Sequence, residues 1–306
     1  MTEATERHMT GGLPVLRLAR LCLAEARPQV QGIFLLRFAV GAVGALPAAA
    51  DGGPAVVGAV AWWGAVVFAY LLNGVTDVAE DRANGSRRPI ARGALPVRTA
   101  GWSAAAVAVA ALGLSAAAGG GLVWWSAVFL ALGWAYSAPP LAAKRWSLSC
   151  SVVVFGLGWT SYAAGAAAAG SGLDRVGLVF AIALSAWMAL VGAVVKDLSD
   201  AGGDAVGGRR TLAARRGLGA ARRLAVLGAV LVGVGGPVAS LVWAPVALAG
   251  TLPLAAGAGW VVTVCVRTAG ERDRHTRRGG YRAFMATQYA ANLALLTALL
   301  VRDAVR

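Results

Sequence analysis

Nine long apolar runs constrain the fold of this chain more than any other feature of its sequence. We place them at residues 29–50, 54–77, 97–117, 121–138, 148–169, 175–196, 220–243, 245–266 and 281–302. Each run approaches the roughly 20 residues that a helix needs to cross the hydrocarbon core of a bilayer. A spanning segment must satisfy its backbone hydrogen bonds as a helix or in a closed barrel, and these runs are too long for barrel strands. The sequence therefore predicts an all-α, polytopic membrane bundle of about nine transmembrane helices.

Composition supports this class and excludes others. Hydrophobic residues make up 58% of the 306 positions, which is more than a soluble domain of this length needs. The three cysteines, Cys22, Cys150 and Cys265, are scattered without metal-ligand spacing, so we interpret them as small apolar side chains rather than a disulfide framework or zinc site. We expect residues 29–302 to form one intramembrane domain, preceded by a cytoplasmic N-terminal segment, residues 1–28.

The basic residues predict an orientation. The formal net charge is +14, and most Lys and Arg residues lie in the N-terminal segment, in the first run, or in and beside the loops after even-numbered runs. The exceptions are Arg175, Arg302 and Arg306. Because positive charge accumulates on the cytoplasmic side of multi-pass proteins, we expect the N-terminus and these loops to face the cytoplasm and the C-terminus to lie opposite. Topology and phosphate attraction account for the charge, so nucleic acid is not an expected partner.

Two clusters of polar residues lie where apolar runs end on this side. The first cluster is Asn73, Asp77 and Asp81, and the second is Asp197, Asp200 and Asp204. The members of each cluster are three or four residues apart, so a helix would present them on one face. The offset from Asp77 to Asp200 equals that from Asp81 to Asp204. This regularity indicates two related four-helix halves, plus one further helix, that present the same chemistry at the same membrane depth.

Arginines follow each cluster within a few residues. Like-charged carboxylates need a compensating cation, and hard oxygen ligands suit Mg²⁺, which binds through a few carboxylates together with phosphate oxygens. Arginine grips phosphate in forked pairs. A single acidic pair at a helix end would be explained most simply as solvated, but two matching clusters favour a magnesium-dependent diphosphate site. Metal and arginine together would stabilise a diphosphate that leaves an allylic ester, with the hydrocarbon tail in the apolar bundle beneath.

These residues and a third motif resemble the UbiA-type intramembrane prenyltransferase superfamily, whose members have nine membrane helices and two aspartate-rich motifs. The family's first motif, Asn-x-x-x-Asp-x-x-x-Asp, is matched by Asn73, Asp77 and Asp81, and its second, Asp-x-x-x-Asp, by Asp200 and Asp204. Its Tyr-Ser-x-Pro-Pro segment is matched by residues 136–140, followed by Lys144 and Arg145. One departure stands out, because many members have Asp directly after the first Asn, where this chain has Gly74.

The resemblance implies a role for each matched residue. The expected ligands of two Mg²⁺ ions are Asn73, Asp77, Asp81, Asp200 and Asp204. The expected diphosphate-binding residues are Arg88, Ser137, Lys144, Arg145 and Lys196, and the expected catalytic residues are Tyr136 and Asp197 together with Arg88, Lys144 and Arg145. Ordinary explanations stay open for some of them: Arg88 and Arg145 as positive-inside charges, and Tyr136 as a membrane-interface tyrosine.

The resemblance also implies an activity, the transfer of an isoprenyl group from a prenyl diphosphate to an acceptor. The acceptors of the family are mostly electron-rich aromatic compounds, with other small nucleophiles in some branches, and the cofactor is Mg²⁺. The main alternative is a terpene cyclase on the same scaffold, in which a double bond of the same chain captures the cation. The aspartate motifs do not separate these two enzymes, because both need the same ionisation machinery. A transporter or lipid-binding bundle without chemistry is a third class.

Arg37 is the one arginine well inside a predicted span. A charge within the membrane usually faces a cavity and has a function. Because Arg37 lies near the cytoplasmic start of its helix, its side chain could equally extend to the interface. The sequence leaves both arrangements open.

Overall fold

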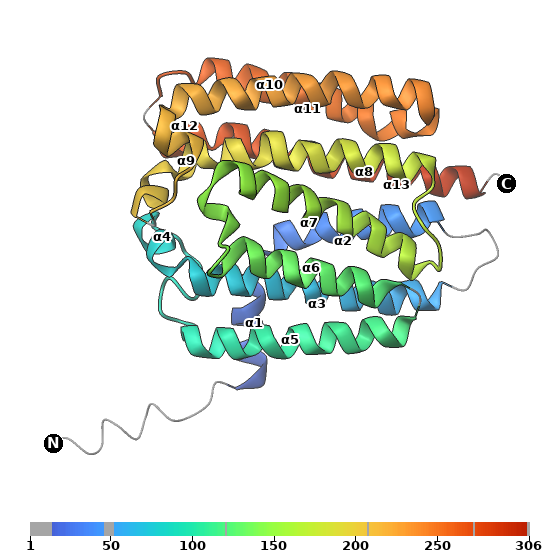
Figure 1. Ribbon diagram of the computed structural model, residues 1–306, viewed down its shortest axis with the longest axis horizontal. Coiled ribbons are helices and arrows are strands. Elements are labelled where there is room, and N and C mark those ends of the chain that lie inside the picture. Colours follow the sequence, from blue (N-terminus) through green and yellow to red (C-terminus); the bar gives the residue numbers. More distant parts are fainter. Residues whose placement is uncertain (1–13, 46–51, 120, 207, 272, 305–306) are drawn as a thin grey trace.

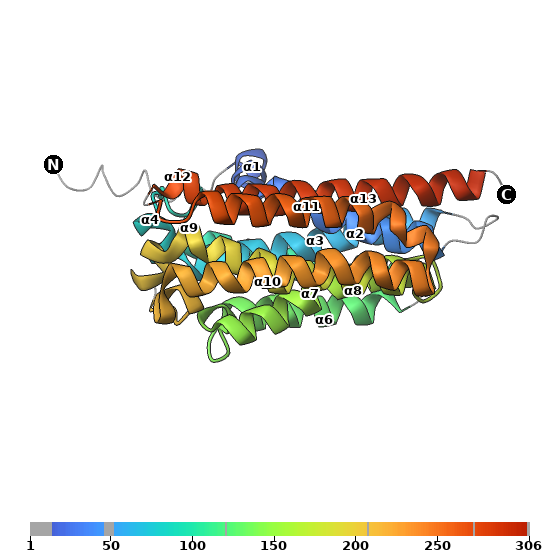
Figure 2. The same ribbon diagram turned by 90° about the horizontal axis from the view of Figure 1, so that it is seen from above.

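The computed structural model describes residues 14–45, 52–119, 121–206, 208–271 and 273–304, and for residues 201–206 and 274 only the backbone. The described chain is helical throughout, and its one strand-like pairing is an isolated bridge between Trp146 and Arg210. The long helices run side by side in an elongated bundle (Figures 1 and 2). The predicted all-α architecture is confirmed.

Nine long helical stretches build the bundle in the described part of the chain. They are α2 (Pro28–Ala45), α3 (Gly53–Thr76), α5 (Val97–Ala118), α6 (Leu122–Ser137), α7 (Ser147–Ala168), α8 with α9 (Arg175–Trp187 and Ala193–Val206), α10 (Leu212–Trp243), α11 (Leu248–Arg267) and α13 (Gly279–Ala304). A π-helical turn, Met188–Gly192, joins α8 to α9. Shorter elements are α1 (Val15–Glu25), α4 (Val78–Ala83), α12 (Arg274–Arg277) and 3₁₀ turns at Ala143–Arg145 and Pro245–Ala247.

The helices follow the predicted spans closely. Among the described residues, seven of these stretches are long and apolar enough to cross a bilayer, including α3, α5 and α7. α6 is a shorter apolar helix, and α2 carries Arg37 near its middle. α10 begins well before the predicted start at residue 220, and it contains a break at Gly217, whose φ is 82°. The end of the first predicted span, residues 46–50, lies outside the described residues. The chain is thus a multi-pass membrane protein.

Small residues let the helices approach closely where lipid provides no hydrophobic driving force. α2 and α7 pack together along much of their length. A Cβ atom at Gly41 would overlap the carbonyl oxygen of Tyr162, and one at Gly165 would overlap the carbonyl oxygen of Phe38. The two backbones therefore meet directly, and this contact joins the first half of the chain to the second.

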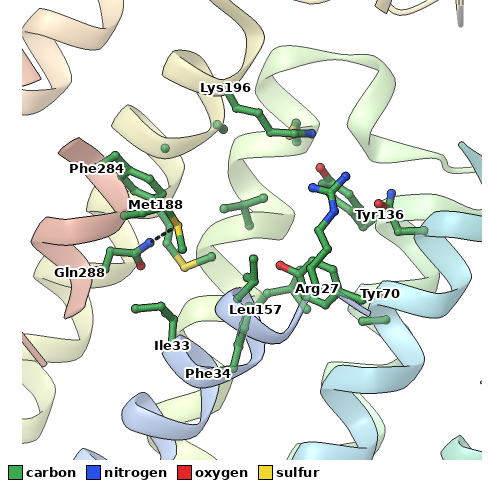
Figure 3. Close-up of a pocket in the computed structure, with 18 of the residues that line it drawn as sticks. Arg27, Ile33, Phe34, Tyr70, Tyr136, Leu157, Met188, Lys196, Phe284 and Gln288 are labelled. Carbon is green, nitrogen blue, oxygen red and sulfur yellow. Dashed lines mark hydrogen bonds between the residues drawn. The ribbon is translucent and has the colours of Figure 1, made fainter. Parts of the chain in front are cut away.

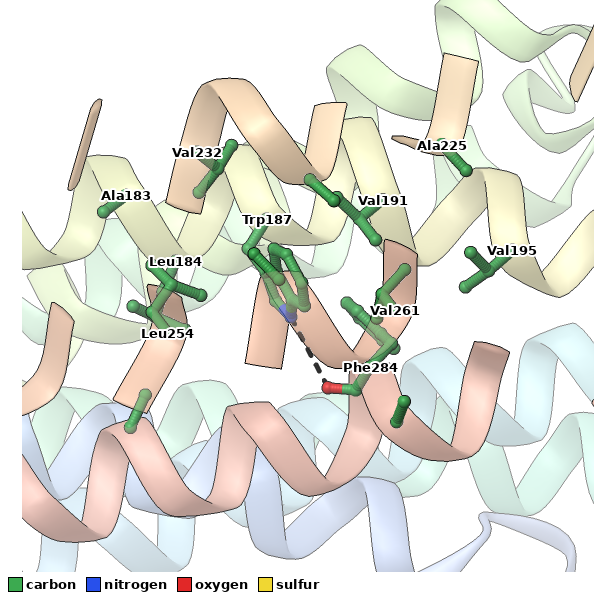
Figure 4. Packing of buried hydrophobic residues seen from close by; sticks show 14 of the residues in the cluster. Ala183, Leu184, Trp187, Val191, Val195, Ala225, Val232, Leu254, Val261 and Phe284 are labelled. Atoms are coloured by element: carbon green, nitrogen blue, oxygen red, sulfur yellow. Dashed lines mark hydrogen bonds between the residues drawn. The ribbon is translucent and has the colours of Figure 1, made fainter. Parts of the chain in front are cut away.

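Apolar side chains fill the spaces between the helices on both sides of this contact. Figure 4 shows the larger cluster, in which Trp187 of α8 stacks on Phe284 of α13 at a centroid separation of 5.9 Å. The Trp187 indole donates a hydrogen bond of 3.4 Å to the backbone carbonyl of Phe284. Large apolar side chains of α10, such as Leu231 and Leu241, are exposed on the outside, as expected of a surface that faces lipid.

The polar motifs gather at one end of the bundle. α4, α9 and α12 lie together there, and the described end of α13 lies at the opposite end (Figure 1). α4 packs against α9. α1 runs across the bundle and packs against α3, with Cys22 and Ala26 buried beside Leu71 and Ile90. Arg27 has a φ of 55° where the chain turns from α1 into α2.

Candidate active site

The first aspartate motif spans the break between α3 and α4. α3 ends at Thr76 and α4 begins at Val78, with Asp77 between them. The motif therefore does not sit on one continuous helix, although the N–H of Asp77 still donates to Asn73 and that of Asp81 to Asp77. Asn73 Nδ2 donates a hydrogen bond of 2.8 Å to Asp77 Oδ2. The spacing of four is kept, and the three side chains stay on neighbouring turns.

Two cations hold the Asp77 carboxylate. Lys144, from the turn after α6, contacts Asp77 Oδ1 and donates a hydrogen bond of 2.6 Å to the hydroxyl of Thr76. Arg209, which follows α9, lies 3.1 Å from Asp77 Oδ2 and also contacts Glu80. All of these charged side chains are buried. Burial lowers the pKa of Lys144, and the charge of Asp77 opposes this shift. The cluster ties three segments that are far apart in the sequence into one charged centre.

A second charged cluster surrounds Arg88. Its Nη1 lies 2.6 Å from Asp81 Oδ2, and its Nε lies 2.8 Å from Glu25 Oε1. The latter contact lies off the N–H direction, so it is an ion pair rather than a hydrogen bond. Arg88 donates instead to the backbone carbonyls of Glu25 and Tyr70. Glu25 is completely buried, and burial raises the pKa of its carboxyl group against the attraction of Arg88.

An apolar cavity of about 130 Å³ opens beside these clusters. Its deeper walls include Phe34, Leu157, Met188 and Phe284. Polar side chains gather toward its other end, where Arg27, Tyr70, Tyr136 and Lys196 extend toward a common space (Figure 3). Asn73, Asp197 and Arg209 line the same cavity. The cavity thus combines apolar walls with a mouth that carries Arg27 and Lys196.

A wider hollow of about 1160 Å³, which we call the vestibule, adjoins the cavity. Asp81 and Arg88 of the first motif segment line it together with Asp200 of the second motif. The cavity and the vestibule share the residues Arg27, Val30, Lys196, Tyr281 and Met285. Arg27 and Lys196 therefore stand at the threshold between the two spaces, and both aspartate motifs border this threshold.

Most of the residues predicted from the sequence meet here. Those that line the cavity or the vestibule, or contact a residue that does, are Asn73, Asp77, Asp81, Arg88, Tyr136, Lys196, Asp197 and Asp200. Lys144 lies one step further out and contacts Asp77. The side chain of Arg145 is exposed and lines neither space. Ser137 is buried, and its hydroxyl finds no hydrogen-bond partner among the described residues. The side chain of Asp204 lies outside the described residues.

Sequence reasoning missed several residues of the site. Arg27, which precedes Pro28 at the start of the first span, was counted as a topology charge. Arg209 belongs to the arginines after the second motif, which were expected to bind phosphate, but it was not singled out. Glu25 and Tyr281 had no signal in the sequence, because their partners are remote along the chain. Glu25, for example, meets Arg88 only because α1 folds across α3.

Arg37 does not extend to the interface. It is completely buried, and its guanidinium donates to Met188 Sδ and Gln288 Oε1. The aromatic rings of Phe34 and Tyr162 lie 5.4 and 5.9 Å from it. Met188, Gln288 and Phe34 all line the cavity, so Arg37 stands directly behind its wall.

The donor chemistry of the site fits Mg²⁺. Within the described side chains, no three His, Cys, Asp or Glu residues converge into a ready metal cage, and basic residues neutralise Asp77 and Asp81. Mg²⁺, however, binds through one or two carboxylates, waters and substrate phosphates rather than through a protein cage. Asn73, Asp77, Asp81 and Asp200 offer only hard oxygen ligands of this kind at one threshold.

Comparison with known proteins identifies the family. Residues 34–293 match the model of the UbiA prenyltransferase family. The chain belongs to this family. Membership implies a transferase enzyme, and it accounts for the two aspartate motifs at one end of the bundle. The family match begins within α2 and ends within α13, and it covers every helix between them. A comparison with curated proteins finds no match.

Solved structures share the UbiA fold. A UbiA homolog from Archaeoglobus fulgidus bound to GPP and Mg²⁺ is 19% identical, with a TM-score of 0.64 over 90% of this chain and 99% of that chain. The same homolog bound to DMAPP and Mg²⁺ gives 18% identity and a TM-score of 0.63 over 89% and 99%. A digeranylgeranylglyceryl phosphate synthase is 14% identical, with a TM-score of 0.64 over 93% of this chain and 99% of that chain. At these identities the likeness establishes the fold.

Proposed function

We propose that this UbiA family member transfers an isoprenyl group from a prenyl diphosphate to an aromatic or other small acceptor within the membrane, with Mg²⁺ as cofactor. One observation carries the proposal: both aspartate motifs border a threshold where a cationic vestibule meets an apolar cavity. An amphiphile with a charged head and a hydrocarbon tail fits these two spaces. The solved homolog that binds GPP and DMAPP with Mg²⁺ supports the same substrate class.

The diphosphate would lie at the threshold. Lys196 and Arg27 border both spaces there, and Arg209 lines the cavity beside them. Fixed cations in a partly buried site stabilise developing negative charge more than they would in water. The tail would extend toward Phe34, Leu157 and Phe284, whose rings and alkyl groups exclude water from the allylic carbon.

The proposed Mg²⁺ ligands are Asn73, Asp77 and Asp81 for one ion and Asp200 with Asp204 for the other. When bound, Mg²⁺ supplies charge neutralisation for the diphosphate oxygens. Lys144 and Arg209 orient Asp77, and Arg88 orients Asp81, so the carboxylates are positioned before substrate arrives. These basic residues also prevent the clustered carboxylates from repelling one another.

The reaction breaks the bond between the allylic carbon and the diphosphate oxygen, and the electron pair leaves with the diphosphate. A nucleophilic carbon or oxygen of the acceptor donates an electron pair to the allylic cation and then loses a proton. Asp197 and Tyr136 line the cavity near its polar mouth, where an acceptor would stand. We assign Asp197 as the residue that takes this proton or orients the acceptor.

We further propose that the vestibule faces the cytoplasm, that residues 29–302 form the intramembrane domain, and that residues 1–28 form a cytoplasmic segment that contributes Arg27 to the site. The positively charged loops after α3, α6, α9 and α11 favour this orientation by the positive-inside rule. A C-terminal fusion to alkaline phosphatase should be active, because that enzyme folds only outside the cytoplasm. An inactive phosphatase fusion beside a fluorescent green-fluorescent-protein fusion would reverse the assignment.

The activity is tested with purified protein in nanodiscs, Mg²⁺, and geranyl, farnesyl and geranylgeranyl diphosphates, first without and then with aromatic acceptors. Transfer predicts that prenyl diphosphate is consumed only with an acceptor, and that Asp77→Asn and Asp200→Asn abolish this consumption. A cyclic product formed without acceptor, and lost in Asp77→Asn, would show a cyclase instead. Asp303→Asn, at the opposite end of the bundle, is the matched control and should behave as wild type.

A further inference from the structure

A buried carboxylate of α1 occupies the place of a side chain at residue 74. A Cβ atom built on Gly74 would overlap Glu25 Oε1, and it would lie 3.0 Å from Glu25 Cδ and 2.9 Å from Arg88 Nη2. Gly74 directly follows Asn73 and belongs to the last turns of α3. The space beside Gly74 therefore holds a carboxylate, and this carboxylate comes from Glu25 of α1 rather than from residue 74 itself.

Glu25 uses both of its carboxylate oxygens. Oε2 accepts a hydrogen bond of 2.9 Å from the backbone N–H of Ile90, and Oε1 lies 2.8 Å from Arg88 Nε. Both partners belong to the loop that follows the first motif. A completely buried carboxylate is costly unless it is paired in this way, because it has lost its hydration. Glu25 therefore ties this loop to α1, and its own burial depends on the loop in turn.

Arg88 is held on every side but one. The Glu25 carboxylate and the backbone carbonyls of Glu25 and Tyr70 contact Nε and Nη2, at distances of 2.8 to 3.2 Å. Nη1 remains, and it lies 2.6 Å from Asp81 Oδ2. The anchored guanidinium thus presents only Nη1 to Asp81, which lines the vestibule. A change at Glu25 would reach the aspartate motif through Arg88.

The docking of α1 does not require a charge. Cys22 and Ala26 are buried beside Leu71, Ile90 and Leu95, and Leu18 and Leu21 pack against the same cluster. These apolar contacts attach α1 to α3 without Glu25. The carboxylate, in contrast, lies against Gly74 and pairs with the polar groups of Arg88 and Ile90 in the motif loop. These contacts indicate that Glu25 acts on the candidate site rather than on the attachment of α1 to the bundle.

We infer that Glu25 is a positioning residue of the first aspartate motif, which fills the place of a side chain at Gly74 and holds Arg88 toward Asp81 and a diphosphate in the vestibule. The effect of Glu25 on turnover rests on the proposed function. The coupling of Glu25 to Gly74 and its effect on the binding of inorganic pyrophosphate do not depend on that function. The positioning role and the proposed activity can therefore be disproved separately.

The coupling is tested with a double-mutant cycle of Glu25→Ala, Gly74→Asp and the double variant. We measure the melting temperature in detergent and the affinity for inorganic pyrophosphate with Mg²⁺ by calorimetry. Each single variant should bind pyrophosphate about tenfold more weakly, because each removes or disrupts a buried charged contact. The double variant should bind more tightly and melt higher than Gly74→Asp alone, because the carboxylate then comes from residue 74. Additive effects on both quantities would overturn the inference.

A second variant separates positioning from folding. Glu25→Gln keeps the size of the side chain and an acceptor for Ile90, but it removes the charge that holds Arg88. Its melting temperature should stay close to that of wild type while its pyrophosphate affinity falls. Cys22→Ala, on the same helix, should lower the melting temperature and leave the affinity unchanged. Wild-type affinity in Glu25→Gln would overturn the positioning role, even if no prenyl diphosphate proved to be a substrate.

Discussion

Arg209 and Asp77 are joined across the two halves of the chain by a contact of 3.1 Å between Nη2 and Oδ2. The same guanidinium contacts Glu80 of α4. Both carboxylates and the arginine are largely buried. The segment after the second aspartate motif thus neutralises the first motif, so each half contributes to the charge balance of the other.

Replacement of this arginine is expected to affect stability and activity together. Arg209→Met leaves two buried carboxylates without a common partner, which costs about 3 kcal/mol in the free energy of unfolding. We expect a lower melting temperature and a higher KM for prenyl diphosphate. Adding Glu80→Gln should recover part of the melting temperature, because one uncompensated charge is removed. A double variant no more stable than Arg209→Met would contradict this account.

Replacement of Lys144 and of its neighbour Arg145 should have very different effects on kcat/KM. Lys144 is buried and contacts Asp77, whereas the Arg145 side chain is exposed and lines neither the cavity nor the vestibule. We expect Lys144→Met to lower kcat/KM at least about a hundredfold, as is typical when a charged group at a reacting centre is lost. Arg145→Met should stay within a few-fold of wild type. Steady-state kinetics at saturating Mg²⁺ distinguish the two, and equal losses would place Arg145 in the site.

Arg37 should influence which prenyl chains the cavity accepts. It fixes Met188 and Gln288, two residues of the cavity wall, from behind. Arg37→Leu removes these contacts without touching the aspartate motifs. We expect the ratio of kcat/KM values for geranyl and geranylgeranyl diphosphates to change, with the same dependence on Mg²⁺ concentration. An unchanged ratio together with unchanged kinetics would remove Arg37 from any role in the site.

The contact between α2 and α7 gives a stability prediction with an internal control. Gly41→Ala places a methyl group against the carbonyl oxygen of Tyr162. This oxygen belongs to the backbone of α7, which cannot easily move away. Gly113 of α5 has open space around it. Gly41→Ala should lower the melting temperature by several degrees, and Gly113→Ala should leave it unchanged or raise it slightly, since alanine favours helix. Equal melting temperatures would mean that the helices separate without cost.

The sequence predicted the parts of this protein that depend on local pattern. Apolar runs indicate membrane helices because lipid allows few other structures. The recurrent spacing of Asn73, Asp77 and Asp81 indicates a candidate site because helix geometry brings residues four apart together. Asp77 was correctly expected near the end of its span. The break there did not follow from the spacing, since α3 stops at Thr76 before α4 begins.

Tertiary structure decided everything that depends on the meeting of distant segments. The sequence contained Gly74 and Glu25, but it did not show that one leaves the space that the other fills. It contained Arg209 among many arginines, of which only the fold selects the one that reaches Asp77. Local spacing determines which residues share a helix face, whereas the partners of a buried charge are determined by which helices pack together, and that depends on the whole bundle.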